Sequence, residues 1–166
     1  MTEDRTPQRR RIVVIGVGNR YRGDDAVGRV VARRLAAVVP GHVEVLEGDG
    51  AATELLNAWA GVEAAIVVDA VVSGAPPGTV HRVDAHASPI SPRIFGRTTH
   101  GLGVAEAVAL GRALGELPAH LVVFGIEAGP TGVGEDPSPP VLGAVDEVVR
   151  RVRDEIRSLE THAADA

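Results

Sequence analysis

The sequence has no cysteine among its 166 residues. Disulfide bonds, thiolate nucleophiles and cysteine-ligated zinc sites are therefore excluded. Aromatic residues are also scarce, at 2% of the chain, so the hydrophobic interior must consist mainly of Val, Ala, Leu and Ile. Any catalytic chemistry has to use oxygen and imidazole groups.

The chain also has little excess positive charge and no long apolar run. Its net charge is -5, and with so few aromatic rings it lacks the basic, base-stacking surface that nucleic-acid binding needs. No stretch approaches the roughly 20 apolar residues of a membrane helix. The basic run at residues 9–11 is followed by an apolar stretch that glycine interrupts at Gly16, too short for a secretory signal. We expect a cytoplasmic protein with neither nucleic acid nor membrane as a partner.

The length fits one compact domain, which we place at residues 11–157, with disordered tails at 1–10 and 158–166. Residues 12–17 form a continuous apolar run, typical of a buried parallel strand. Apolar residues at helical spacing follow, then a strand at 43–46, a helix at 51–59 and a strand that ends at Asp69. This βαβαβ order predicts an α/β fold with a mostly parallel sheet.

The second half of the chain continues the pattern. Residues 79–83 alternate in polarity after a Pro-Pro-Gly turn and predict an edge strand. A loop at 85–99, a helix at 103–115, a buried strand at 121–124 and a long closing helix follow. We therefore expect a last parallel strand and a helix that packs its apolar stripe on the sheet.

The glycine-rich segment after the first strand matches no common nucleotide-binding motif. Gly16 and Gly18 suggest a dinucleotide fingerprint, but Tyr21 occupies the position of its third glycine. A P-loop lysine, an HExxH helix and a Gly-x-Ser-x-Gly elbow are also missing. The segment ends in two carboxylates at a helix start, and we assign Asp24 to the helix N-cap.

Three other side chains are candidates for chemistry. Asp25 follows the first strand, Asp69 ends the third, and His100 lies in a loop before a helix. In a parallel sheet the loops after these strands open at the same carboxyl edge, and the histidine loop can reach it. Two carboxylates and one imidazole suit a divalent ion such as zinc, nickel or manganese, with positions left for water or substrate. This set predicts metal-assisted hydrolysis.

Around these residues the sequence resembles the maturation endopeptidases of nickel-iron hydrogenases. The matching segments occur in order and cover nearly the whole domain: Gly16-Val17-Gly18-Asn19, Asp24-Asp25-Ala26-Val27-Gly28, Val68-Asp69-Ala70, His100-Gly101-Leu102-Gly103, Gly125-Ile126-Glu127 and Ser138-Pro139-Pro140-Val141. The resemblance implies a single-domain three-layer sandwich, with a five-stranded, mostly parallel sheet and helices on both faces. It also implies a metal site at Asp25, Asp69 and His100, and removal of a C-terminal extension from the nickel-loaded hydrogenase large-subunit precursor.

Some positions depart from the family pattern, and some alternatives stay open. Asp25 stands where some relatives carry Glu. Ala128 stands where the family often has a proline directly after the Gly-Ile-Glu segment. The metal is nickel or another divalent ion, resident or brought by the precursor. A non-catalytic nickel-protein chaperone or sensor and a peptidyl-tRNA hydrolase-like enzyme are the alternatives. The sequence gives no oligomeric state and does not identify the hydrogenase.

Overall fold

A computed structural model describes residues 10–19, 23–95, 103–129 and 136–164. Its five strands form one sheet in the order β2-β1-β3-β5-β4. The strands are β1 (Ile12–Val17), β2 (Val43–Gly48), β3 (Ala64–Val71), β4 (Val80–Asp84) and β5 (His120–Glu127). Strands β2, β1, β3 and β5 pair in parallel, and β4 runs antiparallel to β5 at the edge of the sheet. The predicted βαβαβ order and edge strand are confirmed.

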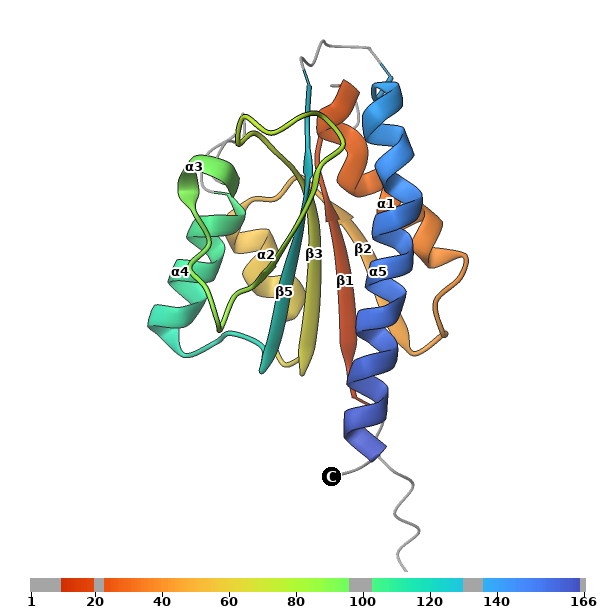
Figure 1. The fold of residues 1–166 in the computed structure, drawn as a ribbon. Helices are drawn as coiled ribbons and strands as arrows, with labels where there is room; N and C mark the ends of the chain where they lie inside the picture. The colour runs from red at the N-terminus through yellow and green to blue at the C-terminus, as the bar shows by residue number, and fades with distance from the viewer. Residues whose placement is uncertain (1–9, 20–22, 96–102, 130–135, 165–166) are drawn as a thin grey trace, which may run out of the picture.

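Helices cover both faces of this sheet (Figure 1). They are the 3-10 helix η1 (Gly23–Ala26), α1 (Val27–Ala36), α2 (Ala52–Trp59), α3 (Pro92–Phe95), α4 (Val104–Leu114) and α5 (Pro139–Ala164). The helices α1 and α5 lie on one face, and α2, α3 and α4 lie on the other. The chain is therefore the predicted single-domain three-layer α/β sandwich.

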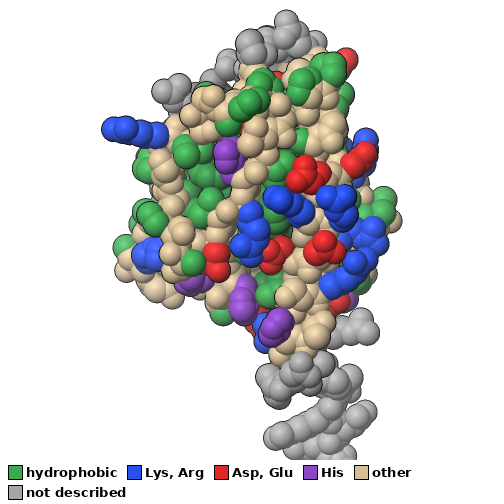
Figure 2. Space-filling view, viewed as in Figure 1, with side chains coloured by type: hydrophobic (Ala, Val, Ile, Leu, Met, Phe, Trp, Pro, Cys, Tyr) green, Lys and Arg blue, Asp and Glu red, His purple; other side chains and the backbone are tan. Residues whose placement is uncertain are grey.

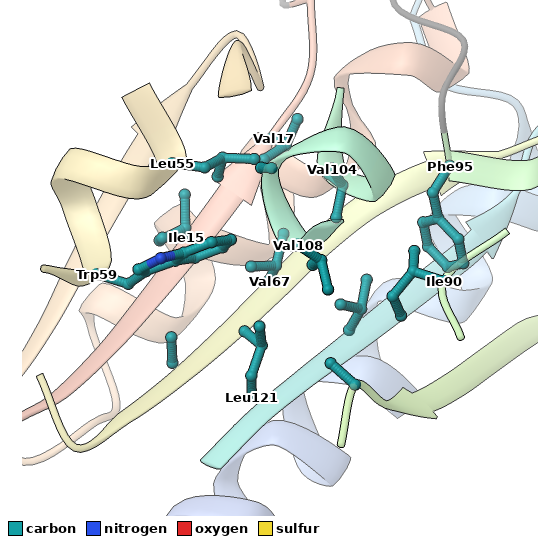
Figure 3. Close-up of a cluster of buried hydrophobic side chains, with 14 of the residues drawn as sticks. Ile15, Val17, Leu55, Trp59, Val67, Ile90, Phe95, Val104, Val108 and Leu121 are labelled. Atoms are coloured by element: carbon teal, nitrogen blue, oxygen red, sulfur yellow. The ribbon is translucent and has the colours of Figure 1, made fainter. Parts of the chain in front are cut away.

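The continuous apolar run of β1 is explained by burial on both faces. Val13, Ile15 and Val17 belong to the hydrophobic cluster beneath α2 and α4, whereas Ile12 and Val14 belong to the cluster beneath α1 and α5. Successive side chains of a strand point to opposite faces, so a central strand must be apolar at every position. Figure 3 shows the first cluster, in which side chains from α2 and α4 project towards β1 and β3.

Two expectations about irregular segments are wrong. The loop expected at residues 85–99 contains the short helix α3. The stretch from residue 158, expected to be a disordered tail, continues α5 as far as Ala164. Leu159 packs against the hydrophobic cluster beneath α1 and α5, and His42 contacts Glu160 at 2.6 Å. These contacts tie the last turns of the helix to the domain.

Two glycines let the start of α1 press directly onto the sheet. A Cβ atom added at Gly16 would lie 2.2 Å from the Gly28 carbonyl oxygen, and one added at Gly28 would lie 2.1 Å from the Val17 oxygen and 2.4 Å from the Val68 oxygen. Only glycine permits such an approach of helix and strand backbones. The turn before α1 is thereby held over the ends of β1 and β3.

No helix within the described residues is long and apolar enough to cross a membrane.

Candidate active site at the carboxyl edge of the sheet

The strand order places β1 and β3 side by side at the point where the chain reverses its direction of winding. From β1 the chain passes through α1 to β2 on one side, and then through α2 to β3 on the other. The loops after such neighbouring strands diverge, which leaves a crevice at the carboxyl edge where open α/β sheets bind ligands. Gly16 pairs with Val68 in register, so the residues after both positions meet at this crevice.

Asp25 and Asp69 are the two carboxylates that this arrangement brings together. Asp25 comes from η1 and is partly buried, whereas Asp69 lies near the end of β3 and is 6% exposed. Burial raises the pKa of the Asp69 carboxyl well above its ordinary value, the negative charge of Asp25 raises it further, and a hydrogen bond from the Ala70 amide lowers it. Asp25 is thus near enough to Asp69 for its charge to act on that carboxyl, and a site shared by the two residues stays a prediction.

His100 lies outside the described residues. Within residues 10–19, 23–95, 103–129 and 136–164, no three His, Cys, Asp or Glu side chains gather closely enough to hold a metal ion. The imidazoles of the described chain have other contacts: His42 pairs with Glu160, His81 with Glu127, and His120 with Arg10. The third member of the predicted trio thus stays a prediction.

Asp24 does not cap α1, and that assignment is wrong. The N-cap residue of α1 is Ala26, which makes no side-chain capping bond. The Asp24 carboxylate is instead 1% exposed and accepts three hydrogen bonds from distant residues. The Gly129 amide donates to Oδ2 at 2.8 Å, the Ser138 hydroxyl donates to Oδ2 at 2.9 Å, and the Ser138 amide donates to Oδ1 at 2.5 Å. Asp24 therefore joins η1 to the start of α5.

Glu127 is a third buried carboxylate at this edge, to which the sequence assigned no role. It ends β5, is 1% exposed, and accepts hydrogen bonds from the Ser73 amide and hydroxyl, both at 2.7 Å, and from the Gly74 amide at 3.0 Å. His81 Nε2 lies 3.1 Å from its Oε2. Burial raises the pKa of this carboxyl, but these hydrogen bonds outweigh burial and lower the pKa below its ordinary value.

Glu127 thereby fixes the turn that follows β3 and Asp69. The signal that could have identified it is an acidic residue at the end of the apolar run that forms β5. A charge at that position is costly to bury unless it is hydrogen-bonded.

Arg29 is a second residue to which the sequence assigned no role. It is buried in α1, and its Nε donates to the Gly18 carbonyl at 2.6 Å while its guanidinium pairs with Asp49 at 2.6 Å. This bridge holds the glycine-rich loop after β1 against the segment after β2. Nothing in the sequence distinguishes Arg29 from the other arginines of the same helix.

Comparison with known proteins identifies the family. A sequence model described as hydrogenase maturation protease matches residues 29–155, which include Asp69 and His100. The chain belongs to the hydrogenase maturation protease family.

Two curated relatives illustrate the match. The hydrogenase 2 maturation protease of Escherichia coli K12 is 34% identical over 125 residues, which cover 70% of this chain and 72% of that protein. The hydrogenase expression/formation protein HupD of Thiocapsa roseopersicina is 32% identical over 121 residues, which cover 70% of this chain and about half, 53%, of that protein.

Solved structures of the family share the fold. The hydrogenase maturating endopeptidase HybD of E. coli superimposes with a TM-score of 0.75 at 29% identity, covering 89% of this chain and 93% of that chain. The maturation protease HybD of Thermococcus kodakarensis gives a TM-score of 0.71 at 26% identity, covering 88% of this chain and 99% of that chain.

The residues at the carboxyl edge suit a divalent cation. A buried carboxylate whose ionised form is disfavoured by burial and by a neighbouring negative charge gains most from a cation placed between the two groups. Carboxylate oxygens, together with an imidazole, form a ligand set that zinc, nickel and manganese all accept. This donor chemistry fits the metal site that the family resemblance implies.

Proposed function

We propose that this chain is the endopeptidase that removes a C-terminal extension from the nickel-loaded large-subunit precursor of a nickel-iron hydrogenase. The observation that carries the proposal is the buried Asp69 carboxyl near the carboxyl end of β3, on which the negative charge of Asp25 acts, in a chain of the hydrogenase maturation protease family.

Each of the three proposed site residues has a role in this reaction. Asp25, Asp69 and His100 are the metal ligands. Asp69 is buried near the end of β3, whereas Asp25 in η1 is partly exposed and so is the more accessible of the two to a precursor. Either carboxylate can accept a proton from an attacking water within hydrogen-bond distance.

The metal is nickel carried by the precursor, or another divalent ion held by the protease. Bound to these ligands, such an ion would polarise the scissile carbonyl or lower the pKa of a water molecule. If the precursor's nickel also bound these protease ligands, the protease would recognise only a precursor that already contains its metal, because the site is incomplete without the ion.

The surface charge supports a protein partner. On the face seen in Figure 2, arginine and acidic side chains are interspersed over the middle and lower part. Mixed charge of this kind suits a folded protein better than a polyanion. It gives no support to the peptidyl-tRNA hydrolase alternative. We place the reaction in the cytoplasm.

The decisive experiment is a cleavage assay with the purified chain and the nickel-loaded precursor, in which mass spectrometry follows release of the C-terminal fragment. The proposal expects a single fragment and a shortened large subunit. Binding to the precursor with no fragment released would favour the non-catalytic chaperone or sensor. Absence of both binding and cleavage would contradict the proposal.

A further inference from the structure

Asp24 is a buried carboxylate at the site that the proposed reaction does not use. Its neighbour Asp25 is a proposed ligand, and both belong to the same short 3-10 helix, η1. Within the described residues, the Asp24 carboxylate accepts hydrogen bonds from two residues more than 100 positions away, and the N-cap of α1 is Ala26. Its partners therefore indicate what it does.

The three donors belong to the two ends of one connection. Gly129 follows β5, and Ser138 directly precedes Pro139, the first residue of α5. The Asp24 carboxylate thus links the segment after β5 to the start of α5. A negative charge at the N-terminus of the 26-residue helix α5 is also favoured by the helix dipole.

The backbone of Asp25 is also held by the glycine-rich loop after β1. The Asn19 amide donates to the Asp25 carbonyl at 3.2 Å. A Cβ atom added at Gly18 would lie only 2.0 Å from the same oxygen, so this loop approaches Asp25 as closely as glycine allows. Arg29 in turn holds the Gly18 carbonyl. Asp25 is therefore held by the glycine-rich loop and, through its neighbour Asp24, by the contacts with Gly129 and Ser138.

We infer that Asp24 is a positioning residue, which fixes Asp25 at the carboxyl edge by anchoring η1 to Gly129 and Ser138. The inference rests on the proposed function for its catalytic consequence, and on the geometry alone for its structural one. A misplacement of about 1 Å in a reacting group can cost roughly 100-fold in rate, so η1 needs an anchor beyond its own short backbone.

Amide hydrogen exchange tests the structural consequence without any activity. In Asp24→Ala, exchange at Gly129 and Ser138 should accelerate by roughly tenfold or more, as expected when charge-assisted hydrogen bonds are lost. The Asn19 amide should accelerate with them, because its acceptor is the Asp25 carbonyl. Amides in the centre of β3 and β5 provide the reference for any change in global stability.

Glu127→Ala is the matched control. It removes another carboxylate that is 1% exposed and has several hydrogen bonds. Exchange should then accelerate at Ser73 and Gly74, with the Asn19 amide unchanged relative to the reference amides. If Asn19 responds equally to both variants, or stays protected in Asp24→Ala, the positioning inference is overturned.

Kinetics test the catalytic consequence. Asp24→Asn should lower kcat on the nickel-loaded precursor by roughly tenfold or more with little change in KM, and Ser138→Ala, which loses only one of the three bonds, should lower it less. An unchanged kcat in folded Asp24→Asn would overturn the inference. A wild-type chain that does not cleave would defeat the proposed function, and the exchange pattern would still decide whether Asp24 positions Asp25.

Discussion

At the scale of single residues, four carboxylates at one edge of the sheet differ in their burial, in the charges beside them and in the hydrogen bonds they accept. Asp69 is buried with a like charge beside it, and Asp25 stays partly exposed. Asp24 and Glu127 are equally buried, but each is surrounded by hydrogen-bond donors from neighbouring loops. We propose the first pair as cation ligands, whereas the hydrogen bonds of the second pair hold loops in place.

Substitution of the proposed ligands should stop processing without unfolding the protein. Asp25→Asn, Asp69→Asn and His100→Ala should each lower cleavage by more than the roughly 10–100-fold that the loss of an outer-shell partner costs. Asp69→Asn should not lower the free energy of unfolding, because it removes a carboxylate that burial and Asp25 both disfavour in its ionised form. Mass-detected cleavage and urea unfolding are the measurements. A variant that still processes the precursor is not at the site.

Glu127 should make the protein sensitive to acid. Its pKa is lower in the folded chain than its ordinary value of 4.5, so its ionised form stabilises the folded state above that value and the benefit disappears as the pH falls through the folded pKa. Glu127→Gln should cost roughly 1–3 kcal/mol at neutral pH. The difference in unfolding free energy between wild type and variant should shrink in acid. A difference that stays constant over the whole pH series would contradict this account.

The sequence predicts Asp25 and Asp69 as neighbours because both follow apolar strands, and parallel strands bring their carboxyl ends to one edge. It does not predict the role of Asp24, since an Asp before a helix has a simple local explanation, and its true partners lie 105 and 114 residues away. Such contacts depend on how α5 returns over the sheet, which no local pattern encodes. Glu127 is similar, because its partners lie in the turn after a different strand.

At the scale of elements, periodicity predicts the strands and the long helices, and fails where an element is short or its end is polar. The four residues of α3 carry too little periodicity to be recognised. The last turns of α5 are rich in charged and polar residues, but Val152, Ile156 and Leu159 continue its apolar stripe into the supposed tail. A packed stripe is therefore better evidence for a helix end than a change in composition is.

The close contact of α1 with the strands should make Gly28 intolerant of any side chain. Gly28→Ala gains up to about 1 kcal/mol of helix propensity, but its methyl group would meet the Val17 and Val68 carbonyl oxygens at 2.1 and 2.4 Å. We expect Gly28→Ala to lower the free energy of unfolding by roughly 1–3 kcal/mol, measured by urea unfolding. Gly41→Ala, which meets nothing within 4 Å, should change stability by no more than about 0.5 kcal/mol. Equal stability of the two variants would show that α1 does not depend on this contact.

At the scale of the whole molecule, the sheet and its helices support the proposed site at one edge of the sheet. The family shares its architecture with this chain at 26–29% identity, because the buried aliphatic layers constrain the sheet and helices more than any particular residue does. The proposed site residues come from three separate parts of the chain: η1 after β1, the last residues of β3, and the segment before α4. Such a constellation is assembled only in the complete domain.

The protease should therefore cut only a folded, nickel-loaded precursor and should leave a synthetic peptide that spans the same bond intact. The reason is the sparseness of its own ligand set, two carboxylates and one proposed imidazole, in a chain with no cysteine and no recognisable protease nucleophile. If nickel on the precursor bridges to these ligands, the metal supplies both recognition and alignment of the scissile bond, and a peptide without it loses both contributions.

The test mixes the purified chain with three substrates: nickel-loaded precursor, precursor without metal, and the isolated peptide. Asp25→Asn with the loaded precursor controls for a contaminating protease. Release of the C-terminal fragment should be seen by mass only from the loaded precursor and only with the wild-type chain. Comparable cleavage of the peptide or of the metal-free precursor would mean that the protease holds its own ion, as an ordinary metallopeptidase does, and that nickel on the precursor is not what the site recognises.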